Sequence, residues 1–144
     1  MGALKQISEY RCGRCGFRMP KGWGGYMYVV NRAGKRISCP HPTEMVRVYK
    51  VLGPRATPET IRRRTGFNSY CVCLDCLKQF KADLGEEGFP IGKHERRDER
   101  KCPKCGSANV RTEQELVGGI CPRCKEGRFE EIDTPKLPCS ASPT

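Results

Sequence analysis

The sequence predicts a small α+β protein in which cross-links replace part of the apolar core. Eleven of its 144 residues are cysteine, a frequency typical of small cross-linked folds. Short β-prone runs alternate with turn residues and with one well-capped helical segment, and long periodic stretches are missing from the sequence. Ten of the eleven aromatic residues precede residue 91, so the last third of the chain has few large apolar side chains for a core of its own.

The spacing of the cysteines favours metal over disulfides as the cross-link. A Cys-x2-Cys pair lets two thiolates reach one metal ion, and disulfide frameworks rarely repeat this spacing four times. The first thirty residues contain no apolar run of the kind found in a signal peptide, and we expect a cytoplasmic protein with reduced thiols. We therefore predict two zinc ions per chain, each held by four cysteines. The four pairs are Cys12/Cys15, Cys73/Cys76, Cys102/Cys105 and Cys121/Cys124.

The last two pairs form the most specific motif in the sequence. Cys102-Pro-Lys-Cys105 and Cys121-Pro-Arg-Cys124 are separated by fifteen residues, which is the spacing of a four-thiolate zinc site. Residues 101–134 resemble the zinc-ribbon family, in which two such knuckles, each at the tip of a β-hairpin, hold one Zn²⁺. The resemblance implies strands at 110–116 and 129–132, and it implies fold and metal rather than function. Iron is the alternative metal, since rubredoxins use similar knuckles, but rubredoxins need wider spacing and an aromatic core.

The first two pairs are predicted to form the second site. A knuckle at Cys12/Cys15, a β-hairpin, and a pair at Cys73/Cys76 that opens a helix resemble a treble-clef zinc finger. That helix is expected from the spacing of apolar residues over 77–84, with a stop at Gly85. Fifty-seven residues separate the two pairs, so an insertion must be accommodated. An alternative takes Cys39 and His41 as partners of Cys12 and Cys15. Cys71 is a further possible ligand, and we interpret it as a small buried apolar residue.

Local patterns predict the remaining elements. Strands at 26–30 and 35–39 flank a turn bounded by Asn31 and Gly34 and form a β-hairpin. Residues 45–52 are a third candidate strand, or one or two helical turns. Thr57 as N-cap followed by Pro58 starts a short helix, which Gly66 ends.

The chain is expected to comprise two folded units. Residues 1–90 form a zinc-binding α+β domain with an irregular lead-in over 1–10, and residues 91–100 form a charged linker. Residues 101–134 form the zinc ribbon, and residues 135–144 form a disordered tail.

The distribution of charge suggests the class of partner. The formal net charge is +11, and residues 1–90 carry 16 Lys and Arg against 7 Asp and Glu. The basic half predicts a nucleic acid or a ribonucleoprotein as partner. Trp23, Tyr26 and Tyr28 offer rings for base stacking, with core packing as the other interpretation. The alternative function is a protein–protein adaptor in a larger assembly that docks through the zinc ribbon. The candidate nucleic-acid-binding residues are Arg55, Arg62, Arg63 and Arg64.

Several function classes are disfavoured. Four-cysteine sites leave no open coordination position for a substrate, so the zinc ions are expected to be structural. The sequence shows no nucleophile–base pair, no paired catalytic carboxylates and no phosphate-binding loop. We therefore expect a protein that is not an enzyme, with no small-molecule substrate and no membrane association.

Overall fold

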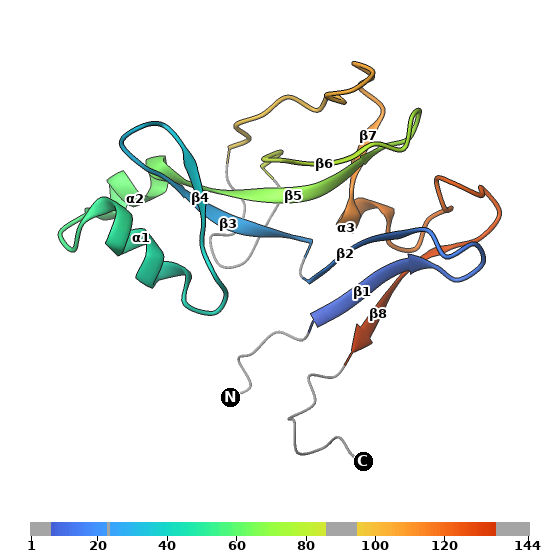
Figure 1. The fold of residues 1–144 in the computed structure, drawn as a ribbon, viewed down its shortest axis with the longest axis horizontal. Coiled ribbons are helices and arrows are strands. Elements are labelled where there is room, and N and C mark those ends of the chain that lie inside the picture. Colours follow the sequence, from blue (N-terminus) through green and yellow to red (C-terminus); the bar gives the residue numbers. More distant parts are fainter. Residues whose placement is uncertain (1–6, 23, 86–94, 135–144) are drawn as a thin grey trace, which may run out of the picture.

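The computed structural model describes residues 7–22, 24–85 and 95–134 and shows a small α+β fold with two antiparallel sheets (Figure 1). The first sheet has the order β2-β1-β8; the second has the order β4-β3-β5-β6, with β7 paired to β5. No helix among the described residues is long and apolar enough to cross a membrane. The strands are β1 (Ile7–Cys12), β2 (Arg18–Gly22), β3 (Gly25–Val30), β4 (Arg36–Ser38), β5 (Thr65–Cys73), β6 (Gln79–Ala82), β7 (Val110–Thr112) and β8 (Phe129–Thr134). The helices are α1 (Glu44–Leu52), α2 (Pro58–Arg64) and α3 (Glu113–Leu116).

Strand β5 is the longest strand and connects the parts of the molecule. Its first half pairs with β3, and its second half pairs with β6 on one side and with β7 on the other. Every β5 residue except Tyr70 is buried, and successive side chains enter different clusters: Val72 packs with Tyr10 and Phe129, whereas Cys71 and Cys73 pack with Val110. Figure 1 shows β5 running from the helices to the hairpins that carry the cysteines.

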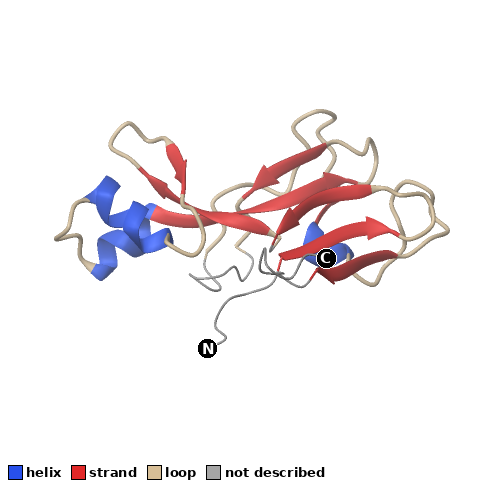
Figure 2. Ribbon diagram, turned by 60° about the horizontal axis from the view of Figure 1, so that its bottom comes forward, coloured by secondary structure: helices blue, strands red, loops and turns tan. Residues whose placement is uncertain are grey.

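The predicted hairpin and the predicted short helix are confirmed. Strands β3 and β4 pair antiparallel, and the Asn31 side chain caps the turn by accepting hydrogen bonds from two backbone N–H groups, at 2.9 and 3.0 Å. Helix α2 begins at Pro58, where the Thr57 hydroxyl accepts a hydrogen bond from the Thr60 N–H at 3.2 Å. Figure 2 shows α1 and α2 together at one end of the molecule.

Residues 44–52 form a helix, so the alternative of helical turns is correct and the strand is wrong. Val48, Val51 and Leu52 lie on one helical face and pack against Met27 and Val29 of β3. Met45, Val46 and Tyr49 lie on the exposed face. The weak alternation of the sequence was thus outweighed by a stripe at helical spacing.

The helix predicted over residues 77–84 is wrong, because this segment forms β6. Leu77 has φ +67°, outside the right-handed helical region, and its N–H donates to the Cys73 carbonyl at 2.8 Å. The chain therefore turns back on β5 directly after the cysteine pair. The apolar side chains Phe80, Ala82 and Leu84 pack into one cluster with a period of two, which competes with the helical spacing. Asp83 is also buried, and Leu77 is partly buried.

Residues on the two sides of the predicted linker share both sheets. Strand β8 pairs along the whole length of β1, from Ile7 opposite Thr134 to Cys12 opposite Phe129, so part of the expected irregular lead-in is a central strand. Strand β7 pairs with β5 in the other sheet. The boundary predicted at 91–100 therefore separates segments that are adjacent in the fold. The predicted tail, residues 135–144, lies outside the described residues.

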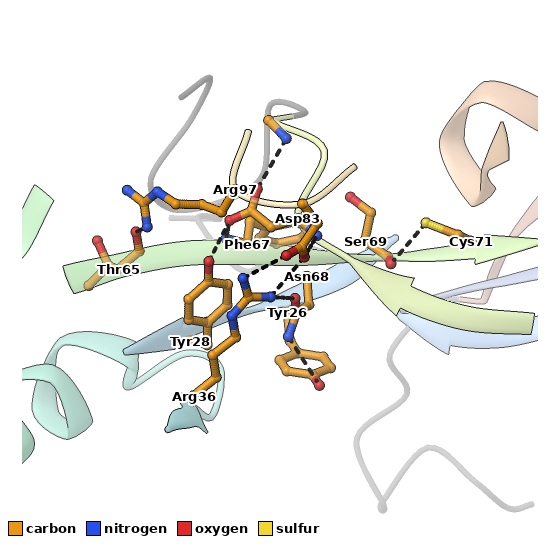
Figure 3. A network of polar contacts seen from close by, with 12 residues as sticks. Tyr26, Tyr28, Arg36, Thr65, Phe67, Asn68, Ser69, Cys71, Asp83 and Arg97 are labelled. Atoms are coloured by element: carbon orange, nitrogen blue, oxygen red, sulfur yellow. Dashed lines mark hydrogen bonds and ion pairs between the residues drawn. The ribbon is translucent and has the colours of Figure 1, made fainter. Parts of the chain in front are cut away.

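The charged linker was predicted over 91–100; residues 91–94 lie outside the described residues, and residues 95–100 are bound to the second sheet, where Figure 3 shows Arg97 beside Thr65 of β5. Asp98 forms a bidentate ion pair with Arg36, with two distances of 2.9 Å, and also accepts a hydrogen bond from the Asp83 N–H at 2.6 Å. Arg97 donates to the Thr65 carbonyl at 2.7 Å. The charges in this run therefore hold the chain in place as it crosses from β6 to β7.

Candidate metal centres

Eight cysteine sulfur atoms gather into two groups of four. The first group, here called the outer site, joins the turn between β1 and β2 to the segment before β8. The second, the inner site, joins the turn between β5 and β6 to the segment before β7. The outer site consists of Cys12, Cys15, Cys121 and Cys124, and the inner site of Cys73, Cys76, Cys102 and Cys105.

The distances within each group fit a tetrahedral zinc ion. A Zn–S bond of about 2.3 Å places tetrahedral sulfur ligands about 3.8 Å apart. In the outer site the Cys12–Cys124 and Cys15–Cys121 sulfur pairs are 3.8 and 3.6 Å apart. The corresponding inner distances, Cys73–Cys105 and Cys76–Cys102, are 3.5 and 3.6 Å. The two groups can each hold a zinc ion, which matches the prediction of two per chain.

All four cysteine pairs adopt the same turn. In each, the N–H of the residue four positions after the first cysteine donates to the carbonyl of that cysteine, at 2.8 to 3.2 Å. The residue that directly follows the second cysteine always has positive φ. Glycine, which tolerates this conformation, occurs at two of the four positions. The residues at the four positions are Gly16 (φ +82°), Leu77 (φ +67°), Gly106 (φ +77°) and Lys125 (φ +61°).

Backbone N–H groups point at the sulfur atoms, as thiolate ligands require. Cys12 Sγ accepts from the N–H groups of Cys15 at 3.4 Å and Arg14 at 3.2 Å, and these bonds lower the pKa of the Cys12 thiol. Cys102 and Cys121 each accept a matching pair of bonds, at 3.3 to 3.5 Å. Both sites thus offer backbone N–H donors to thiolate sulfur, as binding of a divalent metal requires.

Gly127 makes room for the outer site. A Cβ atom at this position would lie 2.5 Å from Cys12 Sγ and 2.6 Å from Arg14 Cβ, closer than real contacts allow. Its N–H also donates to Cys124 Sγ at 3.2 Å. A glycine is therefore required where the segment before β8 passes the first knuckle.

The pairing of knuckles predicted from the sequence is wrong. The expected sets were Cys12, Cys15, Cys73 and Cys76 for one ion and Cys102, Cys105, Cys121 and Cys124 for the other. In the structure the first knuckle joins the last, and the two middle knuckles join each other. The inner site is therefore nested inside the chain segment that the outer site encloses. The physical reason is the pairing of β1 with β8 and of β5 with β7, which aligns these knuckles and separates the expected partners.

The three alternative ligands lie in neither group of sulfur atoms. Cys39 is buried in the cluster that includes Val48, and burial raises the pKa of its thiol to about 11. His41 Nδ1 lies 2.7 Å from Glu44 Oε2. Cys71 is fully buried and donates to the Ser69 carbonyl at 3.4 Å, in keeping with its interpretation as a small core residue.

The predicted nucleic-acid-binding arginines differ in their surroundings. Arg55, Arg62 and Arg63 are exposed near or on α2. Arg64 instead donates two hydrogen bonds to the Val30 carbonyl, at 3.0 and 2.7 Å, and so holds α2 against β3. Of the three aromatic candidates, Tyr28 is buried, Tyr26 is partly exposed, and Trp23 lies outside the described residues.

A basic and aromatic groove, which sequence patterns did not indicate, lies where the two sheets meet. It consists of three adjoining hollows of about 430, 260 and 180 Å³, which share lining residues with one another. Gln79 of β6 donates to the Arg18 carbonyl of β2 at 2.8 Å and ties the two walls together. We call this region the inter-sheet groove. Its lining includes the cations Arg11, Arg18, Lys21 and Lys81, the carboxylates Glu9 and Glu44, and the rings Tyr10, Tyr26, Phe67, Tyr70 and Phe80.

No local signal marks this groove in the sequence, because its cations come from strands about sixty residues apart. Each basic residue belongs to a short strand of mixed polarity, and the nearest motifs, the cysteine pairs, predict metal binding rather than a groove. Comparison with protein-family models, with curated proteins and with solved structures found no match to the chain. The function must therefore be inferred from the geometry itself.

Proposed function

We propose that this is a non-enzymatic zinc-binding protein that binds nucleic acid through the inter-sheet groove. The observation that carries the proposal is the lining of the groove, where exposed cations lie beside partly exposed aromatic rings. Cations neutralise backbone phosphates and rings stack on bases, and grooves that bind single-stranded nucleic acid combine the two.

The metal sites support a structural role for zinc. Four thiolates saturate a tetrahedral ion and leave no position for a substrate or an activated water. Each site joins two knuckles, and in both sites at least one knuckle caps a β-hairpin, so we infer two nested zinc-ribbon-like units. Eight reduced thiolates suit a reducing compartment such as the cytoplasm.

The charge of the metal-loaded protein favours an anionic partner. The formal charge of the chain is +11, and a divalent ion with four thiolates contributes −2 at each site, so the loaded protein carries about +7. In the groove, Arg18, Lys21 and Lys81 are exposed, and Lys21 lies 3.6 Å from Glu9. The arginines near and on α2 form a second exposed basic surface, which contributes to the same long-range attraction.

A mobility-shift assay at several salt concentrations tests the proposal. The logarithm of the association constant should fall linearly with the logarithm of the salt concentration. The expected slope is near −0.7 per single-stranded phosphate contact or −0.9 per duplex contact. The triple variant Arg18→Gln, Lys21→Gln, Lys81→Gln should reduce the magnitude of the slope by about two to three. The matched triple variant Arg55→Gln, Arg62→Gln, Arg63→Gln should reduce it less.

The possible outcomes test two things separately: whether nucleic acid is the partner, and whether the inter-sheet groove is the surface that binds it. No measurable binding of DNA or RNA at about 50 mM salt would end the nucleic-acid proposal. Binding that depends on the α2 arginines and ignores the groove variant would keep the partner and move the surface to α2.

Protein docking is the second candidate function, favoured by the exposed apolar side chain of Ile120. Ile120 lies directly before the last knuckle and is 65% exposed. An adaptor that docks through this region would lose its protein partner in an Ile120→Ser variant and would keep both zinc ions. Retention of a partner by that variant would argue against docking at this position.

A further inference from the structure

The largest hollow of the inter-sheet groove, here called the aromatic pocket, has the features of a site for a single ring. Its volume is about 430 Å³, within the usual range for small-molecule sites. Its lining comes from β2, β3, β5, β6 and the segment from the end of β4 to α1. We infer that this pocket takes one unpaired base of a single-stranded nucleic acid, an inference that rests on the proposed function.

Two tyrosines supply the stacking surface. Tyr26 and Tyr70 line the pocket and pack edge to face, with ring centroids 6.1 Å apart and an interplanar angle of 61°. Both are only partly buried, unlike their neighbour Tyr28, which is 1% exposed. A ring fixed by its neighbour loses little freedom when a base stacks on it, so the pair forms a preorganised platform.

Two lysines at the rim are placed to meet the phosphates that flank such a base. Lys81 Nζ lies 5.3 Å from the centroid of the Tyr26 ring, and Lys21 lines the same pocket from β2. Both side chains are exposed, and the ammonium group of Lys21 also lies 3.6 Å from the Glu9 carboxylate. A base on the tyrosines would bring its own backbone to these two cations.

Part of the pocket lining is polar, and two of its side chains are almost closed to solvent. His41 and Glu44 lie 2.7 Å apart, their side chains are 12% and 6% exposed, and both line the pocket together with Ser38. Buried polar side chains that face a hollow of this size are positioned to hydrogen-bond the edge of a base. The apolar side chains of Met27 and Phe67 also line the pocket.

The concave shape of the pocket selects for a single strand. In a duplex each base stacks on its neighbours and pairs with its partner, so neither its faces nor its pairing edge can reach rings and polar groups inside a hollow. An unpaired base can reach both surfaces at a smaller cost of unstacking. DNA and RNA share this chemistry, so the pocket accepts an unpaired base from either nucleic acid.

Fluorescence anisotropy with zinc-loaded full-length protein tests the inference. The probes are labelled twelve-nucleotide DNA and RNA strands and the corresponding twelve-base-pair duplexes. We expect at least one single strand to bind more tightly than its duplex. Tyr26→Ala should weaken single-strand binding roughly 5- to 150-fold, the range for loss of one stacked base. The matched control is Tyr49→Ala, which removes a 39% exposed tyrosine from α1 outside the pocket and should leave binding unchanged.

A second measurement needs no variant and covers the case in which Tyr26→Ala loses its zinc ions or its fold. Strands that carry 5-iodouracil should crosslink to Tyr26 or Tyr70 on irradiation of the unmodified protein, as mapped by mass spectrometry. Crosslinks confined to other residues, equal binding of strand and duplex, or an unchanged affinity of folded Tyr26→Ala would each overturn the pocket and leave nucleic-acid binding standing. Absence of binding to every probe would overturn both.

Discussion

The sulfur atoms of Cys12 and Cys124 lie 3.8 Å apart, although 112 positions separate the two residues in the chain. This contact defines the nested pairing, and zinc stoichiometry can test it. Cys15→Ser should cost one zinc ion, and the double variant Cys15→Ser, Cys121→Ser should cost no more, because both residues belong to the outer site. The double variant Cys15→Ser, Cys76→Ser should lose both ions.

Consecutive pairing of the knuckles makes the opposite prediction for the two double variants. If Cys12, Cys15, Cys73 and Cys76 shared one ion, Cys15→Ser, Cys76→Ser would retain a zinc ion and Cys15→Ser, Cys121→Ser would lose both. Metal analysis of the purified variants, with Co²⁺ absorption as a second readout, distinguishes these patterns. A retained ion in the Cys15→Ser, Cys76→Ser protein would contradict the nested arrangement.

The strained position after the last knuckle offers a stabilising substitution. Lys125 has φ +61°, and a non-glycine residue in this region costs about 1–2 kcal/mol relative to the right-handed conformation. Replacing Lys125 by glycine removes this cost, but glycine also makes the unfolded chain more flexible and so offsets part of the benefit. Lys125→Gly should therefore raise the free energy of unfolding by about 1 kcal/mol. Lys125→Ala, which keeps the strain and removes the same side chain, is the control. Chemical denaturation in excess zinc measures both, and equal stability of the two variants would argue against strain.

The metal ligands could be predicted from the sequence, and their pairing could not. The Cys-x2-Cys spacing is a local property, because two thiolates three residues apart must reach the same ion. Four such knuckles can combine into two sites in three ways, and spacing favours neighbours in the chain. The pairing of β1 with β8 and of β5 with β7 decides which of the three combinations forms. These strands lie far apart in the sequence, so no local pattern predicts that they pair.

The errors in the predicted secondary structure have causes related to the error in the pairing of the knuckles. The segment around Phe80 carries apolar residues at both helical and strand spacing, and the positive φ of Leu77 decides in favour of the strand. A glycine at position 77 would have signalled that turn, as Gly16 and Gly106 do in two other knuckles. The helix at Thr57 was predictable because its cap and its proline are local signals. The inter-sheet groove was not, because β2 and β6 meet only in the folded chain.

The buried contact between Tyr28 and Asp83 makes Gly66 sensitive to substitution. Tyr28 donates to Asp83 Oδ2 at 2.7 Å, and burial together with this bond raises the pKa of Tyr28 (Figure 3). A Cβ atom at Gly66 would overlap both the carboxylate and the phenol. Since both groups are held by hydrogen bonds and packing, Gly66→Ala should lower the free energy of unfolding by about 3 kcal/mol or more.

Gly13→Ala is the matched control for Gly66→Ala. The nearest atom to a Cβ at Gly13 is Glu130 Oε1 at 3.7 Å, an ordinary contact with a mobile side chain end. We expect its effect on the free energy of unfolding to stay within about 0.5 kcal/mol. Similar losses from the two alanine substitutions in urea denaturation would show that the overlap at Gly66 is relieved by a shift of the surrounding strands.

Glu113, the first residue of α3, should make stability depend on pH in the direction opposite to an ordinary carboxylate. Its side chain is fully buried, and neither carboxylate oxygen has a hydrogen-bond partner among the described residues. Burial and, to a smaller extent, the nearby Glu131 raise the pKa of Glu113 from 4.5 to about 8. The folded protein therefore holds a proton on Glu113 at a pH where the unfolded chain has released it.

The sign of the effect follows from which state binds the proton more tightly. The contribution of Glu113 is fully present below pH 4.5, falls as pH rises, and reaches its minimum above about pH 8. The slope between these values is at most about 1.4 kcal/mol per pH unit. The glutamine in Glu113→Gln is neutral at every pH. The difference in free energy of unfolding between this variant and the wild type should therefore grow in favour of the variant from about pH 6 to pH 8 and then level off.

Urea denaturation in excess zinc over this range measures the difference. The control is Glu130→Gln, on the exposed side of β8, whose stability should run parallel to that of the wild type. A constant difference between Glu113→Gln and the wild type across these pH values would show that Glu113 is ionised in the folded protein throughout.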